Sequence, residues 1–164
     1  MGTGPLVSVM MPCYNSESTL PMAVASLFAQ TYPNWEAVIV DDGSTDGTWE
    51  LLCGFSDDRL RLHRFEGNRG RGAARQQCLE MARGELLAFL DADDWLFPDK
   101  LAKQVSLMES HPEITVLSAS CVITDADGNA VGVARAGVEP GSSFTRGRMA
   151  HPGTDSKDAA RIRN

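Results

Sequence analysis

The sequence lacks any long hydrophobic run. No apolar stretch approaches the ~18 residues that a membrane-spanning helix needs. The N-terminal segment, MGTGPLVSVMMP, places no basic residue ahead of its apolar run, and this argues against a secretory signal. We therefore expect a cytoplasmic protein, which in a full-length form can in addition lie peripherally on a membrane.

Positive charge is scarce as well. The 164 residues include 15 Lys and Arg against 22 Asp and Glu, for a formal net charge of −7 at pH 7. Nucleic-acid partners generally require a basic face, so this balance argues against them. A local cluster of arginines between Arg59 and Arg75 still leaves small anionic molecules as ligands.

Pairs of cysteine or histidine are absent too. The four cysteines lie far apart with no CxxC pair, and the three histidines are isolated from one another. Scattered cysteines in a chain of this kind are most often reduced core residues. With 43% hydrophobic and 23% charged residues, the chain has the composition of one ordinary globular domain with a substantial core.

What is present is an alternation of apolar runs with helical periodicities. The spacing of Leu20, Val24 and Leu27 predicts a helix that Ser18 caps. Similar spacings predict three further helices, one ending near residue 52, one over 74–82 that stops at Gly84, and one beginning at Pro98. Short β-rich runs predict strands near residues 7–11, 37–40, 60–65 and 85–90.

The arrangement of these elements predicts the fold class. The runs near residues 7, 37 and 85 are continuous, which is typical of strands covered on both faces. Strands alternating with helices over short connections predict a parallel sheet. We expect an α/β, Rossmann-like fold: a mainly parallel sheet with helices on both faces, and a C-terminal β-hairpin around the turn DADGN. This domain would span residues 1–135, followed by a poorly framed tail over residues 136–164.

Polar residues follow three of the predicted strands: PCYN after the first, DDGS after the second and DADD after residue 90. In a doubly wound sheet, ligands bind beyond the carboxyl ends of the strands. Carboxylates gathered there repel one another unless they share a cation. Oxygen ligands favour Mg²⁺ or Mn²⁺, held by one or two carboxylates together with substrate phosphates. The candidates at this edge are Tyr14, Asn15, Asp41, Asp42, Asp91, Asp93 and Asp94.

A loop that mixes glycine with arginine, GNRGRGAAR at residues 67–75, precedes a predicted helix. Backbone N–H groups at the start of a helix attract anions, so this loop is a candidate for phosphate binding. On its own the loop equally fits a solvated turn with surface arginines, and it gains weight only from the acidic edge beside it.

Two segments carry a family resemblance, VSVMMPCYNSESTLPMAVASLFAQTYPNWEAVIVDDGSTDGTWELL and NRGRGAARQQCLEMARGELLAFLDADDW. Over about Val7 to Lys100, the chain resembles the family-2 inverting glycosyltransferases of the GT-A fold, with several motifs in the family's order and spacing. The resemblance implies a nucleotide-sugar donor, UDP in preference to GDP, bound with Mg²⁺ or Mn²⁺. It also implies a carbohydrate, lipid-linked or other hydroxyl acceptor.

The resemblance further implies roles for residues at matching positions. Pro12 and Tyr14 would flank the nucleotide base, and Asp42 would contact the base or the ribose. In the D-x-D motif, Asp91-Ala92-Asp93, the last aspartate would bind the metal under the diphosphate. Arg71 stands where a basic residue approaches the nucleotide, and Glu17 is a further candidate at the base. The expected nucleotide-binding residues are thus Pro12, Tyr14, Asp42, Arg71 and Asp91, and the expected metal ligand is Asp93.

The catalytic base of that family, an acidic residue often found in a Glu-Asp pair, has no counterpart here. No such pair follows RMAHPG at residues 148–153, so we assign no catalytic base. We expect residues 136–164 to begin an acceptor-binding part, and the chain to be a glycosyltransferase that is incomplete for catalysis on its own. A non-catalytic or truncated nucleotide-sugar-binding module is the alternative, because it would keep the donor site and lack the base.

Other functions with strand-end motifs fit less well. A dehalogenase-like phosphatase places its D-x-D on the first strand. A nicotinamide dehydrogenase needs G-x-G-x-x-G where this chain has MPCYNSES. A calcium loop starting at Asp42 would need Glu at its twelfth position, which is Cys53.

Overall fold

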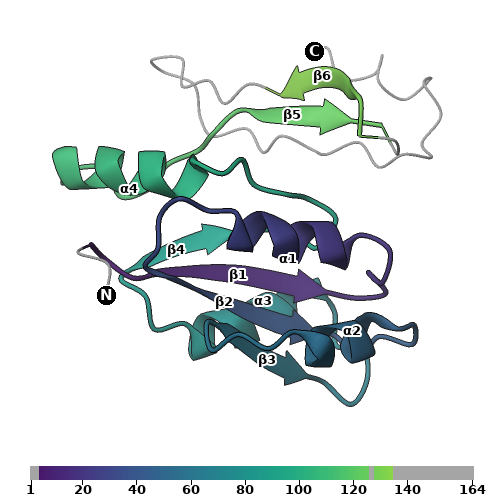
Figure 1. The fold of residues 1–164 in the computed structure, drawn as a ribbon. Coiled ribbons are helices and arrows are strands. Elements are labelled where there is room, and N and C mark those ends of the chain that lie inside the picture. The colour runs from purple at the N-terminus through teal and green to yellow at the C-terminus, as the bar shows by residue number, and fades with distance from the viewer. Residues whose placement is uncertain (1–3, 126–127, 135–164) are drawn as a thin grey trace, which may run out of the picture. The chain divides into compact units, whose positions relative to one another are not determined.

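The computed structural model describes residues 4–125 and 128–134, and the chain divides into two units, Met1–Ile114 and Thr115–Asn164. The first unit is built on one parallel sheet with the strand order β3-β2-β1-β4 (Figure 1). Its strands are β1 Val7–Cys13, β2 Trp35–Asp41, β3 Leu60–Arg64 and β4 Leu86–Phe89. Its helices are α1 Leu20–Phe28, α2 Thr48–Gly54, α3 Arg71–Met81 and α4 Lys100–Ser110. The predicted α/β class with a mainly parallel sheet is confirmed.

Helices cover both faces of this sheet. α1, α2 and α4 contribute to one buried cluster, in which Val9 and Ile39 of the sheet pack with Leu27 of α1. α3 covers the opposite face, where Val38 packs with Cys78. Every residue of β1 and β2 is buried, and each fully buried large aliphatic side chain contributes about 1.5–3 kcal/mol. The two central strands therefore carry most of the core.

The edge strand β4 is covered on one face. Leu86 and Ala88 pack against the cluster under α1, whereas Leu87 and Phe89 are 45% and 63% exposed. The expectation that this strand is covered on both faces is wrong, because α3 packs on β1 and β2 and leaves the corresponding face of β4 in solvent. None of the helices in the described part of the chain is long and apolar enough to cross a membrane.

Three helix boundaries differ from those expected. The N-cap residue of α1 is Thr19 and not Ser18, and no side chain caps the helix, whose first turn instead contains a proline that has no N–H to satisfy. α3 ends before Gly84 is reached, so this glycine does not stop it. α4 begins after a turn that contains Pro98.

Gly84 instead lets the start of β4 approach β1. Its N–H donates to Ser8 Oγ over 2.8 Å, and a Cβ at Gly84 would lie 2.6 Å from both the Leu6 carbonyl oxygen and the Ser8 nitrogen. The Ser8 hydroxyl donates to the buried Glu36 carboxylate over 2.6 Å. That carboxylate also accepts the Arg83 N–H over 2.8 Å. This polar network determines where β4 joins the sheet.

The second unit contains a β-hairpin. β5 Cys121–Thr124 pairs antiparallel with β6 Ala130–Ala134, with an irregularity between Ile123 and Thr124. In the turn, Gly128 has a φ of +84° and donates its N–H to the Asp125 carbonyl over 3.0 Å. The predicted C-terminal hairpin is confirmed. The expected tail, residues 136–164, lies outside the described residues.

We predict that Gly84→Ala lowers the free energy of unfolding by about 2 kcal/mol, because the new methyl group would push on strand backbone and not on a flexible side chain. Gly54→Ala is the matched control. No atom lies within 4 Å of a Cβ at Gly54, which ends α2, so stability should stay the same or rise by up to about 1 kcal/mol. Urea denaturation of both variants checks this, and equal stabilities would show that β4 can shift at no cost.

Candidate functional site

Strand register places the candidate residues at one edge of the sheet. Cys13 of β1 pairs with Asp41 of β2, and Asp41 pairs with Arg64 of β3. On the other side of β1, Met10 pairs with Phe89 of β4. Because the strands are parallel, the segments that follow β1, β2 and β4 all leave the sheet at its carboxyl edge. β2 and β4 flank β1, so these two strands lie about 10 Å apart.

The first aspartate of the DDGS segment is structural. Asp41 is fully buried and accepts hydrogen bonds from the Ser44 N–H, over 3.0 Å, and from the Ser44 hydroxyl. Arg64 Nε lies 3.1 Å from Asp41 Oδ2 at an angle outside hydrogen-bond geometry, and Arg64 Nη2 donates to the Ser44 carbonyl over 2.9 Å. These contacts compensate the buried charge and fix the turn after β2.

The second aspartate holds the glycine-arginine loop. Asp42 is 3% exposed, and its two carboxylate oxygens accept the backbone N–H groups of Arg69, over 2.7 Å, and Gly70, over 2.9 Å. Gly43, with a φ of +71°, allows the turn to lie against Gly67, where any Cβ would come within 2.5 Å of backbone. Two amides of the predicted anion site are therefore filled by a carboxylate of the protein itself. A carboxylate has about four acceptor positions, so Asp42 retains capacity for a ligand.

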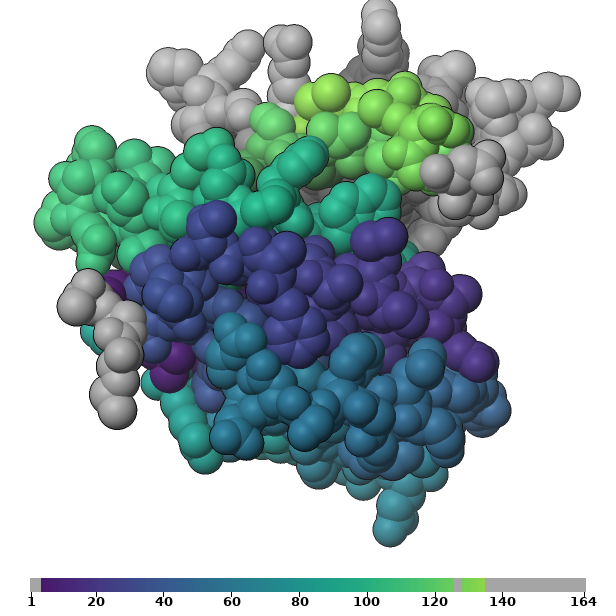
Figure 2. Space-filling model, in the orientation of Figure 1, coloured from purple at the N-terminus to yellow at the C-terminus, as the bar shows by residue number. Residues whose placement is uncertain are grey.

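The loops after β1 and β2 are joined to each other, and Figure 2 shows these purple and blue segments adjoining on the surface of the first unit. Asn15, at a φ of +49°, donates its N–H to Ser44 Oγ over 2.9 Å and accepts the Thr45 N–H over 2.9 Å. Glu17 accepts the Gly47 N–H over 3.0 Å. The Glu17 carboxylate thus has a structural contact, and its expected role at a nucleotide base stays a prediction.

The two residues expected to flank a base differ in exposure. Pro12 is buried within β1, opposite Val40. Tyr14 follows the strand and is 45% exposed. The tyrosine ring is therefore accessible to a ligand, whereas the proline is buried in the strand that precedes it.

The DADD segment follows β4 and turns sharply. The buried Ala92 faces the core, the Asp94 N–H donates to the Asp91 carbonyl over 3.0 Å, and Asp93 is left exposed. Asp91 Oδ1 accepts a hydrogen bond from Arg75 Nη2 over 3.1 Å. Burial, and then the charges of Asp93 and Asp91, raise the pKa of the Asp94 carboxyl above its ordinary value. The segment therefore holds more negative charge than its surroundings neutralise.

This chemistry fits a hard divalent cation, although the described residues form no ready-made cage. Within residues 4–125 and 128–134, no three Asp, Glu, His or Cys side chains come together to hold a metal ion. Mg²⁺ and Mn²⁺ sites that serve nucleotides commonly use only one or two carboxylates, with phosphates and waters completing the shell. The exposed carboxylate of Asp93 suits that arrangement.

Arginines line the neighbouring surface. Arg71, the first residue of α3, is exposed, and the guanidinium carbon of Arg69 lies 4.5 Å from the centre of the Phe65 ring. Arg64 and Arg75 were not predicted as partners of the carboxylates at this edge. A signal existed for Arg75, since it follows Arg71 by one helical turn.

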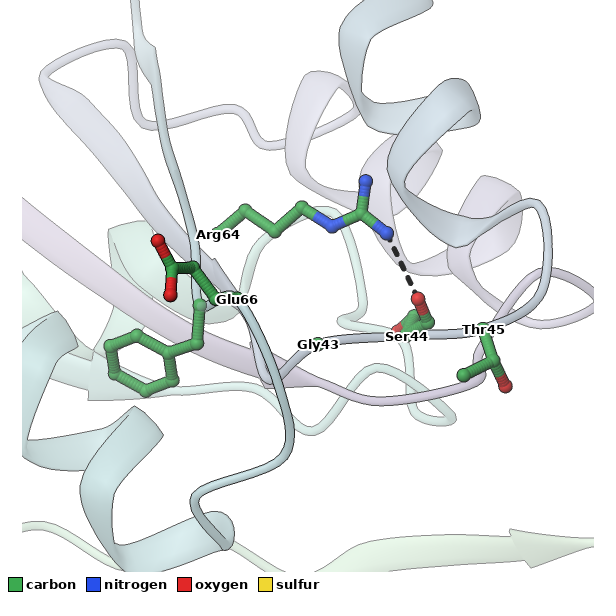
Figure 3. Close-up of a pocket in the computed structure, with 6 residues that line it drawn as sticks. Gly43, Ser44, Thr45, Arg64 and Glu66 are labelled. Atoms are coloured by element: carbon green, nitrogen blue, oxygen red, sulfur yellow. Dashed lines mark hydrogen bonds between the residues drawn. The ribbon is translucent and has the colours of Figure 1, made fainter.

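An open depression of about 430 Å³ lies beside this edge, lined by Gly43, Ser44, Thr45, Arg64, Phe65 and Glu66. Figure 3 shows Arg64 reaching across it to the carbonyl oxygen of Ser44. None of the six predicted site residues lines the depression, and Asp42 adjoins it only through Gly43. We place the candidate site at the carboxylates of this edge and not in the depression, because the carboxylates are the groups that can bind a divalent cation.

Residues 8–154 match the model of glycosyl transferase family 2. The chain belongs to this family. The resemblance drawn from the two sequence segments is thereby confirmed, and homologues with glycosyltransferase names support the assignment to an enzyme family.

Curated relatives share more than a third of the aligned residues. The chain is 38% identical over 128 residues to the putative glycosyltransferase EpsE of Bacillus subtilis (strain 168), covering 76% of this chain and 46% of EpsE. It is 43% identical over 103 residues to an Escherichia coli protein named UDP-Glc:alpha-D-GlcNAc-diphosphoundecaprenol beta-1,3-glucosyltransferase WfgD, covering 63% of this chain and 41% of WfgD. The chain thus spans less than half the length of these two relatives.

Solved structures show the same fold. TarS 1–349 of S. aureus, crystallised with UDP, is 30% identical with a TM-score of 0.63, covering 77% of this chain and 38% of that one. The mannosyltransferase PcManGT of Pyrobaculum calidifontis, solved with GDP-Man and Mn²⁺, is 28% identical with a TM-score of 0.63, covering 74% and 36%. These neighbours confirm the GT-A fold predicted from the sequence.

We predict that Asp42→Ala frees the loop before α3. An N–H that loses a buried acceptor costs about 1–3 kcal/mol, so hydrogen exchange at the Arg69 amide should accelerate about tenfold or more. The effect at Gly70 should be smaller, because its N–H also donates to Asn68 Oδ1 over 3.1 Å. Asp93→Ala is the control, since Asp93 is exposed, and it should leave both amides unchanged. Exchange at unchanged rates in Asp42→Ala would mean that the packing of Gly43 on Gly67 holds the loop without the carboxylate.

Proposed function

We propose that the chain is the donor-binding part of a glycosyltransferase that moves a sugar from a nucleoside-diphosphate sugar to an acceptor hydroxyl, with inversion and with a divalent metal. The observation that carries the proposal is the gathering of Tyr14, Asp42, Asp91 and Asp93 at one sheet edge, in a chain that matches glycosyl transferase family 2. Ligands of doubly wound sheets bind at this edge.

The nucleoside end of the donor is assigned to the segments after β1 and β2. The half-exposed ring of Tyr14 offers a face on which a base can stack, above the strand position held by Pro12. Asp42 is held rigidly by two N–H groups, which leaves its remaining lone pairs for donors on the base or ribose. Arg71 brings a positive charge to the start of α3, on the side of the phosphates.

The diphosphate end is assigned to the segment after β4. Asp91, whose Oδ1 lies 3.1 Å from Arg75 Nη2, would accept a hydrogen bond from a ribose hydroxyl, and Asp93 would hold Mg²⁺ or Mn²⁺ together with the diphosphate. When bound, that cation supplies neutralisation of the negative charge that develops on the leaving nucleoside diphosphate. Burial first, and then the charges of Asp93 and Asp91, raise the pKa of the Asp94 carboxyl, and a cation bound here would offset that carboxylate charge.

UDP is favoured over GDP as the nucleotide. The structure of TarS was solved with UDP and with UDP-GlcNAc, and the name of WfgD specifies UDP-Glc. PcManGT, in contrast, was solved with GDP-Man. The name of WfgD also includes a diphosphoundecaprenol acceptor, which supports a lipid-linked hydroxyl acceptor and work at a membrane surface for the whole protein.

We predict that UDP binds in calorimetry only when Mn²⁺ or Mg²⁺ is present, and that Asp93→Asn weakens this binding about tenfold or more, since the metal loses a charged ligand. Asp58→Asn is the matched control, because Asp58 is exposed and precedes β3 at the opposite edge of the sheet. Asp57 would be a poor control: its hydrogen bonds to Arg59 lower the pKa of Asp57 to about 2. Equal UDP affinity with metal and with EDTA would refute the assignment of Asp93.

A further inference from the structure

The contact between Arg75 and Asp91 joins α3 to the acidic segment after β4. Arg75 Nη2 lies 3.1 Å from Asp91 Oδ1, with the two side chains 35% and 31% exposed. Two neighbours of Arg75 on α3, Ala74 and Cys78, are fully buried against β1 and β2. The helix cannot rotate without exposing this core, so the direction in which Arg75 leaves it is fixed.

One hydrogen-bond donor of the Arg75 guanidinium has no acceptor among the described residues. Its Nε is buried and finds no hydrogen-bond partner among the described residues. A buried donor without a partner costs about 1–3 kcal/mol, and such a group in a native structure calls for an explanation. Here the guanidinium gives up one donor while it keeps its contact with Asp91.

The charges of the segment give that contact a consequence. Three carboxylates, Asp91, Asp93 and Asp94, lie within residues 91–94, and Arg75 neutralises one of them. We propose that Arg75 is a positioning residue for the donor site: its ion pair orients Asp91 toward the nucleotide and withholds it from the metal, which is left to Asp93. This inference rests on the proposed function, which already gives Asp91 to the nucleotide and Asp93 to the metal, and it adds the residue that maintains this division of labour.

The division of labour predicts opposite effects on two ligands. Removing the positive charge of Arg75 makes the segment more negative and frees Asp91, so a bare divalent cation should bind more tightly. The same change leaves Asp91 without its orienting partner, so UDP should bind more weakly. General damage to the fold would instead weaken both.

The test is Arg75→Met, which retains much of the apolar stem and removes the charge. Electron paramagnetic resonance measures the affinity for free Mn²⁺ without nucleotide, and calorimetry measures UDP affinity in saturating Mn²⁺. We expect Mn²⁺ affinity to rise about three- to tenfold, the scale of a screened charge change a few ångströms from the ion. We expect UDP affinity to fall about five- to tenfold. Arg83→Met is the control, because Arg83 is exposed and precedes β4 at the opposite edge, and it should change neither affinity.

Two further variants separate positioning from direct contact. Arg75→Lys keeps the charge, so its Mn²⁺ affinity should stay near that of the unmodified chain. In an Asp91→Asn background, Arg75→Met should have little further effect on UDP, because a residue that acts through Asp91 loses its effect when Asp91 is neutral. A full additive loss of UDP binding in that background would show that Arg75 touches the nucleotide itself, and would overturn the inference.

The remaining outcomes distinguish a failure of the positioning role from a failure of the proposed function. If the unmodified chain binds UDP with metal and Arg75→Met weakens Mn²⁺ and UDP together, the proposed function stands and the positioning role falls. If the unmodified chain binds neither ligand, both fall. Thermal melting of each variant shows whether a loss of both affinities comes from unfolding.

Discussion

The burial of two adjacent carboxylates at the end of β2 constrains most of the surface where the ligand is proposed to bind. Asp41 is fully buried and Asp42 is 3% exposed, and ionised carboxylates survive such burial only when donors or opposite charge replace the lost water. Ser44 and Arg64 do so for Asp41, and the N–H groups of residues 69 and 70 do so for Asp42. Because these donors come from the turn after β2, the end of β3 and the start of α3, satisfying one pair of side chains orders three segments at once.

α3 connects the segment after β2 with the segment after β4. Its start is held by Asp42 on the side of β2, and Arg75, one turn further along, meets Asp91 on the side of β4. Between the two contacts, Ala74 is fully buried against the sheet. The nucleoside side and the phosphate side of the proposed site are thus attached to one rigid helix, and a site held in its binding geometry before the ligand arrives loses less entropy on binding.

Features that depend on neighbours along the chain were predictable from the sequence, and features that depend on neighbours in space were not. Apolar runs and helical spacings predicted β1, β2, α1 and α3, and the parallel order then brought the polar strand ends to one edge. The apolar run predicted that Leu87 and Phe89 are buried. Both are exposed, because β4 is the last strand of the sheet, and the order of strands is not visible in the local sequence. Gly84 was predicted to end a helix. Its close approach to β1 involves residues far away in the sequence, so local sequence patterns could not predict it. The partners of Asp42 are 27 and 28 residues away, so the sequence predicted a polar residue at the end of β2 but not the N–H groups that hold it.

The charge at this edge determines how its proposed ligands depend on each other. A diphosphate is anionic, and the segment after β4 is acidic, with Asp94 already shifted to a raised pKa by burial and by its carboxylate neighbours. Arg75 offsets one of these charges, and among the described residues neither Asp93 nor Asp94 has an ion-pair partner. A nucleoside diphosphate alone would meet net repulsion, whereas one carrying a divalent cation would not. The coupling is reciprocal, because whatever factor the metal adds to nucleotide affinity the nucleotide adds to metal affinity. The proposed metal ligand, Asp93, is exposed, and the part of the chain that the structure describes forms no preformed metal cage. Such a site is suited to taking up the cation and the nucleotide together and to releasing them together.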